Sequence, residues 1–111
     1  MMLHDKKGKE ITFEKCAKLL AEDDYKIVGR TEKDGYLIST IWLGTNHGIL
    51  NNKPLFFETM IFKIDCKNKL VDYRVECYRE PYATEPEAIA GHDYAVEHLA
   101  ELIKGVLNEN S

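Results

Sequence analysis

Three side chains in this sequence have the right chemistry for catalysis, namely His47, Glu58 and His92. Two imidazoles and one carboxylate can bind a divalent metal with open positions, or act as a general acid and a general base. The local spacing does not support such a site, because the chain has no H-x-x-x-H or H-E-x-x-H pattern. Catalysis would therefore require the three side chains to converge in the folded protein, and neither a metal nor a cofactor is predicted.

Glu58 lies in a predicted strand over Leu55–Ile64, and the alternation of side chains places it on the same face as three apolar residues. These neighbours are Phe56, Met60 and Phe62. A carboxylate in such surroundings is either held in its neutral form or paired with a cation. The structural alternatives are a Glu at a strand edge that reaches solvent, or one paired with an arginine of the next strand such as Arg74.

His92 interrupts the apolar stripe of the last predicted helix, between Ile89 and Val96, and is therefore expected to face the sheet. A buried imidazole needs a hydrogen-bond partner. A carbonyl of the sheet or the carboxylate of Glu58 would satisfy it without any catalytic role. The alternative is that His92, Glu58 and His47 form one cluster.

The longest predicted connection runs from Gly44 to Pro54 and contains His47. Long loops on a rigid sheet often carry function, although turn-forming asparagines are also typical of an ordinary surface loop. This loop and its surroundings complete the predicted binding set, which is Trp42, Asn46, His47, Glu58 and His92.

The elements that position these residues predict one α+β domain over residues 1–111. A first helix is expected over Phe13–Asp23, capped by Thr12. Four strands follow in an antiparallel meander, with an Asp34-Gly35 turn in the first hairpin. The strands are predicted at Tyr25–Arg30, Tyr36–Leu43, Leu55–Ile64 and Val71–Tyr78.

The chain closes with an amphipathic helix whose start is marked by a Thr84-Glu85-Pro86-Glu87 capping box. Its predicted buried stripe consists of Ile89, His92, Val96, Leu99, Ile103 and Val106. Ala88, Gly91 and Ala95 form a row of small residues that is expected to let the helix lie close to the strands. Residues 1–10 are expected to form a flexible arm, and residues 108–111 a frayed tail. The middle strands are apolar on both faces, so a homodimer is expected if both helices pack on the same face.

Composition and net charge argue against some classes of function. The chain has 111 residues, 44% of them hydrophobic, and a formal net charge of −4. This charge argues against nucleic-acid binding, and there is no apolar run of membrane-spanning length. Three widely spaced cysteines predict reduced thiols and a cytoplasmic location. No phosphate-binding or nucleophile motif is present in the sequence.

Three segments of the sequence, taken in this order, resemble a family of short hypothetical proteins encoded by bacteriophages and prophages. They are the stretches WLGTNHG from Trp42, FETMIF from Phe57 and YATEPEAIAGH from Tyr82. The resemblance covers the second strand to the start of the last helix, and it carries no assigned activity. Family members often have Asp where this chain has Asn46, and several glycines after the position of His47.

This resemblance implies a non-catalytic phage accessory protein in the cytoplasm of the host cell. We expect it to bind a host protein or a small ligand, for example as an anti-defence inhibitor of the anti-CRISPR kind or as a sponge for a signalling nucleotide. The alternative is a small metal-dependent or acid–base enzyme that uses His47, Glu58 and His92. A third and weaker alternative is nucleic-acid binding through exposed tyrosines.

Overall fold

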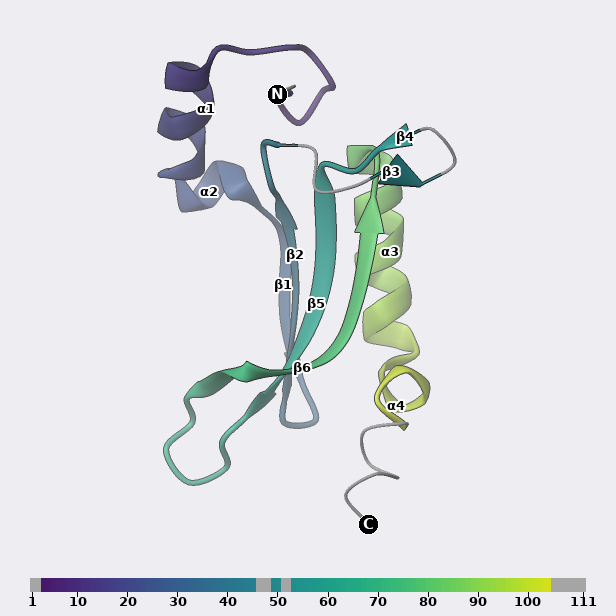
Figure 1. Ribbon diagram of the computed structural model, residues 1–111. Helices are drawn as coiled ribbons and strands as arrows, with labels where there is room; N and C mark the ends of the chain where they lie inside the picture. Colours follow the sequence, from purple (N-terminus) through teal and green to yellow (C-terminus); the bar gives the residue numbers. More distant parts are fainter. Residues whose placement is uncertain (1–2, 46–48, 51–52, 105–111) are drawn as a thin grey trace.

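The computed structural model describes residues 3–45, 49–50 and 53–104 of the chain. Helices flank a sheet that is built from four of the six strands (Figure 1). The helices are α1 (Phe13–Leu20), α2 (Asp23–Lys26), α3 (Glu85–Glu97) and α4 (Leu99–Leu102). The strands are β1 (Ile27–Lys33), β2 (Tyr36–Trp42), β3 (Ile49–Leu50), β4 (Lys53–Pro54), β5 (Phe57–Ile64) and β6 (Val71–Tyr82).

The predicted fold class is confirmed. The main sheet is antiparallel in the order β1-β2-β5-β6, which is the expected meander, and β3 and β4 form a small separate hairpin in the predicted 44–54 loop. Asp34 and Gly35 both have positive φ, at 52° and 83°, in the two-residue turn between Lys33 and Tyr36. That backbone conformation follows the right-handed twist of the strands and explains the choice of residues.

Several element boundaries differ from the prediction, most clearly at the first helix and at the last strand. The first helix ends at Leu20, and the short helix α2 takes residues that were expected at the start of the first strand. The last strand continues beyond Tyr78 to Tyr82 and includes Pro81. Proline is tolerated there because β6 is an edge strand, so its missing N–H faces no neighbouring strand.

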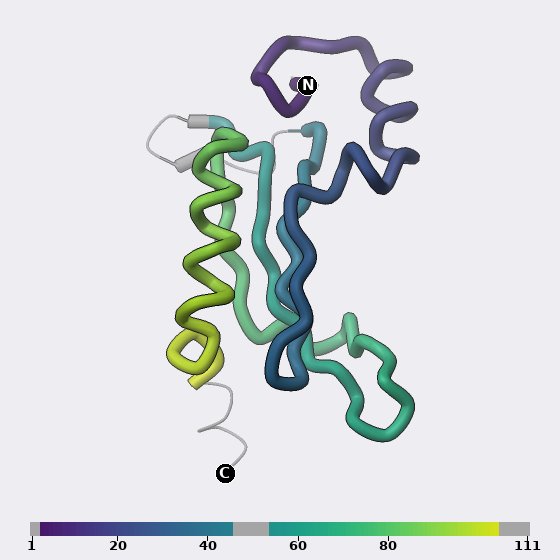
Figure 2. The backbone as a smooth tube through the Cα atoms, turned by 180° about the vertical axis from the view of Figure 1, so that it is seen from behind, coloured from purple at the N-terminus to yellow at the C-terminus, as the bar shows by residue number. Residues whose placement is uncertain are grey.

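Helix α3 packs on one face of the sheet, and the view from behind shows it in front of the strands (Figure 2). The capping box is confirmed, because the Thr84 hydroxyl accepts from the Glu87 amide. The predicted stripe is wrong at Ile89, which is 48% exposed. The buried positions are instead Ala88, His92, Ala95, Leu99 and Ile103, while Val106 and residues 108–111 lie outside the described residues.

The small side chains Ala88 and Ala95 explain this rotation of α3. They let the helix axis approach the strands closely, so the contact line follows the small residues and not the larger Ile89. Tyr94, at 51% exposure, lies on the outer side with Ile89.

Residues 3–10 pack against the domain and do not form the flexible arm expected from the sequence. Leu3 is buried in the core with Cys16, Trp42 and Phe56. The amide of His4 donates to the Gly44 carbonyl, and the indole N–H of Trp42 donates to the His4 carbonyl at 2.9 Å. Burial of one apolar side chain and these hydrogen bonds attach the segment.

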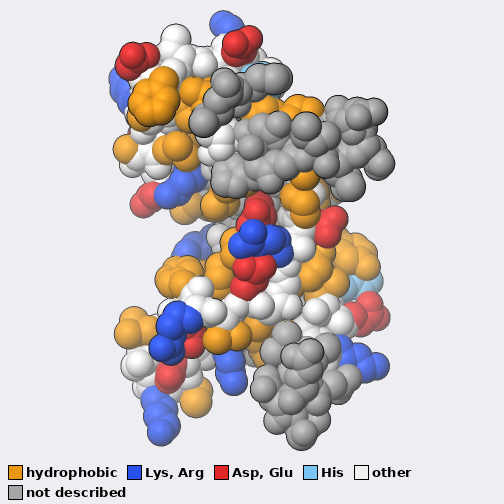
Figure 3. Space-filling model, in the orientation of Figure 1, with side chains coloured by type: hydrophobic (Ala, Val, Ile, Leu, Met, Phe, Trp, Pro, Cys, Tyr) orange, Lys and Arg blue, Asp and Glu red, His pale blue; other side chains and the backbone are white. Residues whose placement is uncertain are grey.

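On the face of the sheet opposite α3, no helix packs among the described residues, and part of β6 covers one end of this face. Leu37 is fully buried there, and Phe62 is nearly so because the Tyr73 ring packs edge-on against it at 5.0 Å between centroids. Figure 3 views the molecule from this side and shows charged side chains of both signs among the apolar ones. The bare apolar face that would favour a homodimer is therefore smaller than the strand pattern suggests.

Within the described ranges, none of the helices has the length and apolar character needed to cross a bilayer.

Candidate functional site

A hydrogen-bonded chain of buried polar side chains lies between α3 and the sheet, with His92 at its centre. Nδ1 of His92 lies 2.8 Å from the Thr40 hydroxyl, and Nε2 lies 2.9 Å from the Thr31 hydroxyl. The hydroxyl of Thr40 also contacts that of Thr59, and Thr59 hydrogen-bonds the phenol of Tyr82. Each of the four strands β1, β2, β5 and β6 thus contributes one hydroxyl, and α3 contributes the imidazole.

Two glycines make room for these hydrogen-bonded side chains. A Cβ on Gly29 would lie 2.8 Å from the His92 ring, and a Cβ on Gly91 would lie 2.1 Å from the Tyr82 phenol oxygen. No side chain larger than hydrogen fits at either position without a shift of the rings. Gly91 belongs to the row of small residues expected to face the strands, whereas no sequence pattern indicates glycine at position 29.

Burial lowers the pKa of His92, and the neighbouring Asp93 only partly opposes this effect. The same cause raises the pKa of Tyr82. His92 is therefore held neutral, with one ring nitrogen donating and the other accepting a hydrogen bond. Thr40 and Thr59 are fully buried. A substrate has no access to them, so we interpret this row of hydrogen-bonded side chains as structural.

Glu58 is buried on the face of the sheet opposite α3. It is paired with a cation, which is one of the alternatives predicted for it. The cation is Arg79, with Nε 3.3 Å from the Glu58 carboxylate, and the suggested partner Arg74 is wrong. Arg79 also forms two hydrogen bonds to Glu76, whereas Arg74 pairs with Asp72 within β6. The register explains the difference, because Arg79 lies opposite Met60, the next residue on the same face as Glu58.

Two members of the predicted cluster, Glu58 and His92, are not brought together. Glu58 is adjacent in β5 to Thr59, which points toward α3 and His92, so Glu58 must point away from them. The proposed hydrogen bond between Glu58 and His92 is wrong for the same reason. His47 and Asn46 lie outside the described residues. Among the residues that are described, no group of three or more His, Cys, Asp or Glu side chains could hold a metal ion.

Comparison of the chain with protein-family models, curated proteins and solved structures finds no match. The resemblance to phage-encoded proteins therefore remains a prediction.

Trp42, another residue of the predicted binding set, is fully buried. Its indole packs edge-on against Tyr25 at 5.1 Å between centroids, and its N–H is used by His4. We therefore assign Trp42 to the core, where it joins the end of the sheet to α2 and the N-terminal segment.

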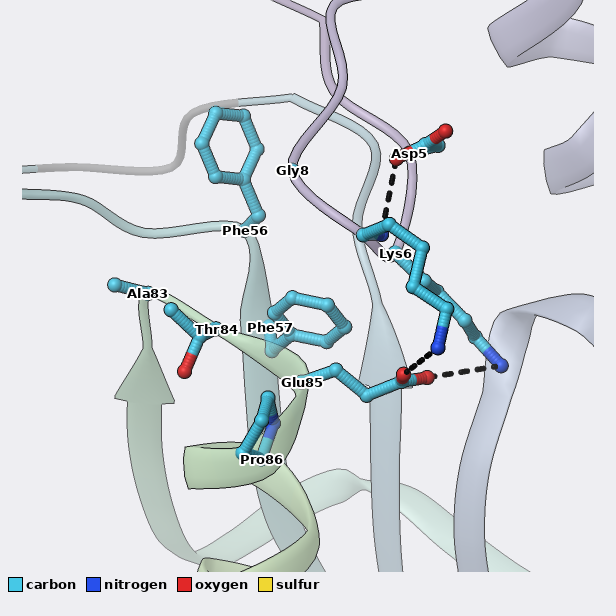
Figure 4. A pocket seen from close by; sticks show the side chains of 10 residues that line it. Asp5, Lys6, Gly8, Phe56, Phe57, Ala83, Thr84, Glu85 and Pro86 are labelled. Atoms are coloured by element: carbon cyan, nitrogen blue, oxygen red, sulfur yellow. Dashed lines mark hydrogen bonds and ion pairs between the residues drawn. The ribbon is translucent and has the colours of Figure 1, made fainter.

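A hollow of about 370 Å³ lies where the N-terminal segment meets the start of α3 (Figure 4). Its apolar lining includes Phe56, Phe57 and Pro86. On one side the Glu85 carboxylate lies 3.2 Å from the Lys7 ammonium and 3.9 Å from that of Lys6. Since these charged groups already satisfy one another, we interpret the hollow as the site where the N-terminal segment attaches to α3.

The substitution Glu85→Gln tests this interpretation. It should lower the free energy of unfolding by less than about 1 kcal/mol, because ion pairs near the surface contribute little. Amide hydrogen exchange should nevertheless speed up at Lys6 and Lys7 and stay unchanged in β5. Glu87→Gln, on the same helix turn, is the matched control. Unchanged exchange in the N-terminal segment would show that the ion pairs do not hold it.

A different surface has the features most typical of a protein interaction site. It is not among the sites predicted from the sequence. Residues 63–75, here called the projecting hairpin, extend from the lower end of the sheet (Figures 1 and 2). Three large apolar side chains on it are exposed, Leu70 at 65%, Tyr73 at 62% and Val75 at 45%. The hairpin also holds four basic and two acidic residues, although the whole chain has a net charge of −4. This reversal of local charge was visible in the sequence.

The projecting hairpin has a defined shape in its described residues. The Asp65 carboxylate accepts hydrogen bonds from the amides of Lys67 and Asn68, which fixes the turn. Consecutive pairs Lys63–Asp72 and Phe62–Glu76 leave Tyr73, Arg74 and Val75 as a bulge in β6. A bulge of this kind re-aims side chains away from the sheet.

Proposed function

We propose that this chain is a non-catalytic binding protein whose projecting hairpin docks on a partner protein. The observation that carries the proposal is the gathering of Leu70, Tyr73 and Val75, all exposed, on one basic hairpin. Figure 3 shows apolar and basic side chains together at the lower end of the molecule, where the hairpin lies. Exposed apolar clusters with a polar rim are typical of protein interaction sites.

The rigidity of the hairpin supports this proposal. Tyr73 rests against Phe62, and Arg74 is held by two hydrogen bonds to the Asp72 carboxylate. Pre-ordered tyrosine and arginine side chains lose little conformational entropy on binding and are enriched among residues that dominate interface energies. The partner that fits is an acidic protein surface with an apolar groove for Tyr73 and Leu70.

The resemblance to phage proteins suggests where such a partner would be found. A phage accessory protein of this size would act by occupying a surface of a host protein, for example one that belongs to a defence system. A protein partner is favoured over nucleic acid because Asp65 and Asp72 lie among the basic residues and because Leu70 and Val75 cannot stack on bases.

Affinity capture from a bacterial lysate with matched variants tests the proposal. We expect the wild-type chain to retain a protein that Leu70→Ser/Tyr73→Ser does not retain. Phe13→Ser is the control, because Phe13 is 74% exposed but lies on α1, away from the hairpin. Equal capture by the hairpin variant, or capture that disappears after nuclease treatment, would contradict the proposal.

A further inference from the structure

The outer face of α3 is an acidic surface with exposed apolar side chains. Between Glu85 and Ile103 the chain has no lysine or arginine. The exposed carboxylates of α3 and α4 are Glu87, Asp93, Glu97 and Glu101, and on the exposed side of the helix Ile89 and Tyr94 flank this acidic face. Tyr94 is fixed by stacking on His98 with ring centroids 4.2 Å apart. Lys6 and Lys7 pair with Glu85 at the start of α3, and Lys33 donates to the Val96 carbonyl near its end, so these lysines contact the two ends of the helix.

This surface complements the projecting hairpin in both charge and apolar character. Of the six large apolar side chains that are exposed in the described chain, three lie on the hairpin and two on α3. The hairpin has four basic and two acidic residues, whereas α3 has acidic side chains and no lysine or arginine. Opposite charges around apolar centres are the pattern of two surfaces that bind each other.

The two surfaces cannot meet within one molecule. In both backbone views the hairpin projects on one side of the sheet and α3 lies on the other (Figures 1 and 2). The complementary surface must therefore belong to a second molecule, and this chain itself supplies one.

We propose that the projecting hairpin of one copy docks on the outer face of α3 of a second copy, and that the exchange is reciprocal. Reciprocal docking gives a closed two-fold dimer, whereas one-way docking of the same surfaces would continue into a filament. The proposal deepens the proposed function, since it names a partner for the same hairpin. A dimer of this kind would keep the hairpin covered until a competing partner displaces α3.

Charge reversal with the pure protein tests the dimer. The wild type should sediment as a dimer that weakens as salt is raised. Lys67→Glu/Lys69→Glu on the hairpin, and separately Asp93→Lys/Glu97→Lys on α3, should each raise the dimer dissociation constant about tenfold or more. An equimolar mixture of the two variants should regain the dimer, because each now offers the opposite charge to the other. Lys15→Glu/Lys18→Glu on α1 is the control.

Two results would overturn the dimer. One is a wild-type chain that stays monomeric across the concentration series at low salt. The other is a dimer that neither pair of reversals weakens, which would place the contact elsewhere. Both results leave capture of a foreign protein by the hairpin untouched, so failure of this inference is distinguishable from failure of the proposed function. Circular dichroism confirms that each variant is folded.

Discussion

The free energy of unfolding should fall as the pH is lowered below the ordinary pKa of histidine, and His92 should be the cause. In the folded protein burial holds the pKa of His92 below its ordinary value of 6.5. The unfolded chain therefore takes up a proton more readily than the folded chain. Stability is fully present above pH 6.5 and is lost progressively as the pH falls toward the lowered pKa of the folded state.

Protonation also changes the hydrogen bonds of the His92 ring. Both ring nitrogens of imidazolium donate, so Thr31 and Thr40 must both accept from the ring, whereas neutral imidazole accepts a hydrogen bond at one of its two nitrogens. Both partners are neutral hydroxyls and not carboxylates, so the buried charge is poorly compensated and the charged state is costly.

His92→Gln isolates this effect. At pH 8 we expect a loss of about 1–3 kcal/mol in the free energy of unfolding, because a buried threonine hydroxyl loses a partner. Between pH 8 and pH 5 the variant should lose much less stability than the wild type. Ala90→Gly, at an exposed position of the same helix, is the control, because it destabilises the helix without removing a titratable group and should keep the wild-type pH dependence. Equal pH dependence in wild type and His92→Gln, measured by urea denaturation, would contradict the assignment.

Gly91→Ala should destabilise the protein, although alanine is the better helix former by about 1 kcal/mol. The new Cβ would lie 2.1 Å from the phenol oxygen of Tyr82 and 2.2 Å from the adjacent ring carbon. Either the ring or the helix must move, and overpacking of this kind costs about 1–3 kcal/mol. The net change in thermal denaturation should therefore be a lower melting temperature.

A double-mutant cycle identifies the contact. Tyr82→Ala removes the ring, and Gly91→Ala in that background should stabilise the protein or leave it unchanged. Ala90→Gly, at the exposed neighbouring position, measures helix propensity alone and should cost about 1 kcal/mol. A stabilising effect of Gly91→Ala in the wild-type background would show that α3 does not lie this close to Tyr82.

The fold was predictable from the sequence because local signals agreed with one another. The Asp34-Gly35 turn, the capping box at Thr84 and the period-two strands each indicated the element that the structure contains. The face of α3 was predictable in part. The apolar stripe wrongly included Ile89, whereas the row of small residues Ala88, Gly91 and Ala95 correctly marks the side that lies close to the strands.

The site was less predictable because it depended on how strands lie relative to one another. His92 was correctly placed toward the sheet, but its partners are threonines of β1 and β2 that carry no periodic signal. Glu58 and His92 were grouped by residue type, although adjacent strand positions send them to opposite faces. The basic hairpin was missed because charge was considered for the whole chain and not for each segment.

The row of hydroxyls under α3 also affects which strand pairings are allowed. If β2 slipped by two residues along β5, Thr40 would leave Thr59 and face Ile61 or Phe57, with apolar residues still inside. Hydrophobic burial alone would therefore tolerate the slipped sheet. The threonine hydroxyls and the imidazole disfavour the slipped sheet, because each would then be buried without a hydrogen-bond partner. The polar row thus discriminates the native alignment from its nearest misfolded competitor.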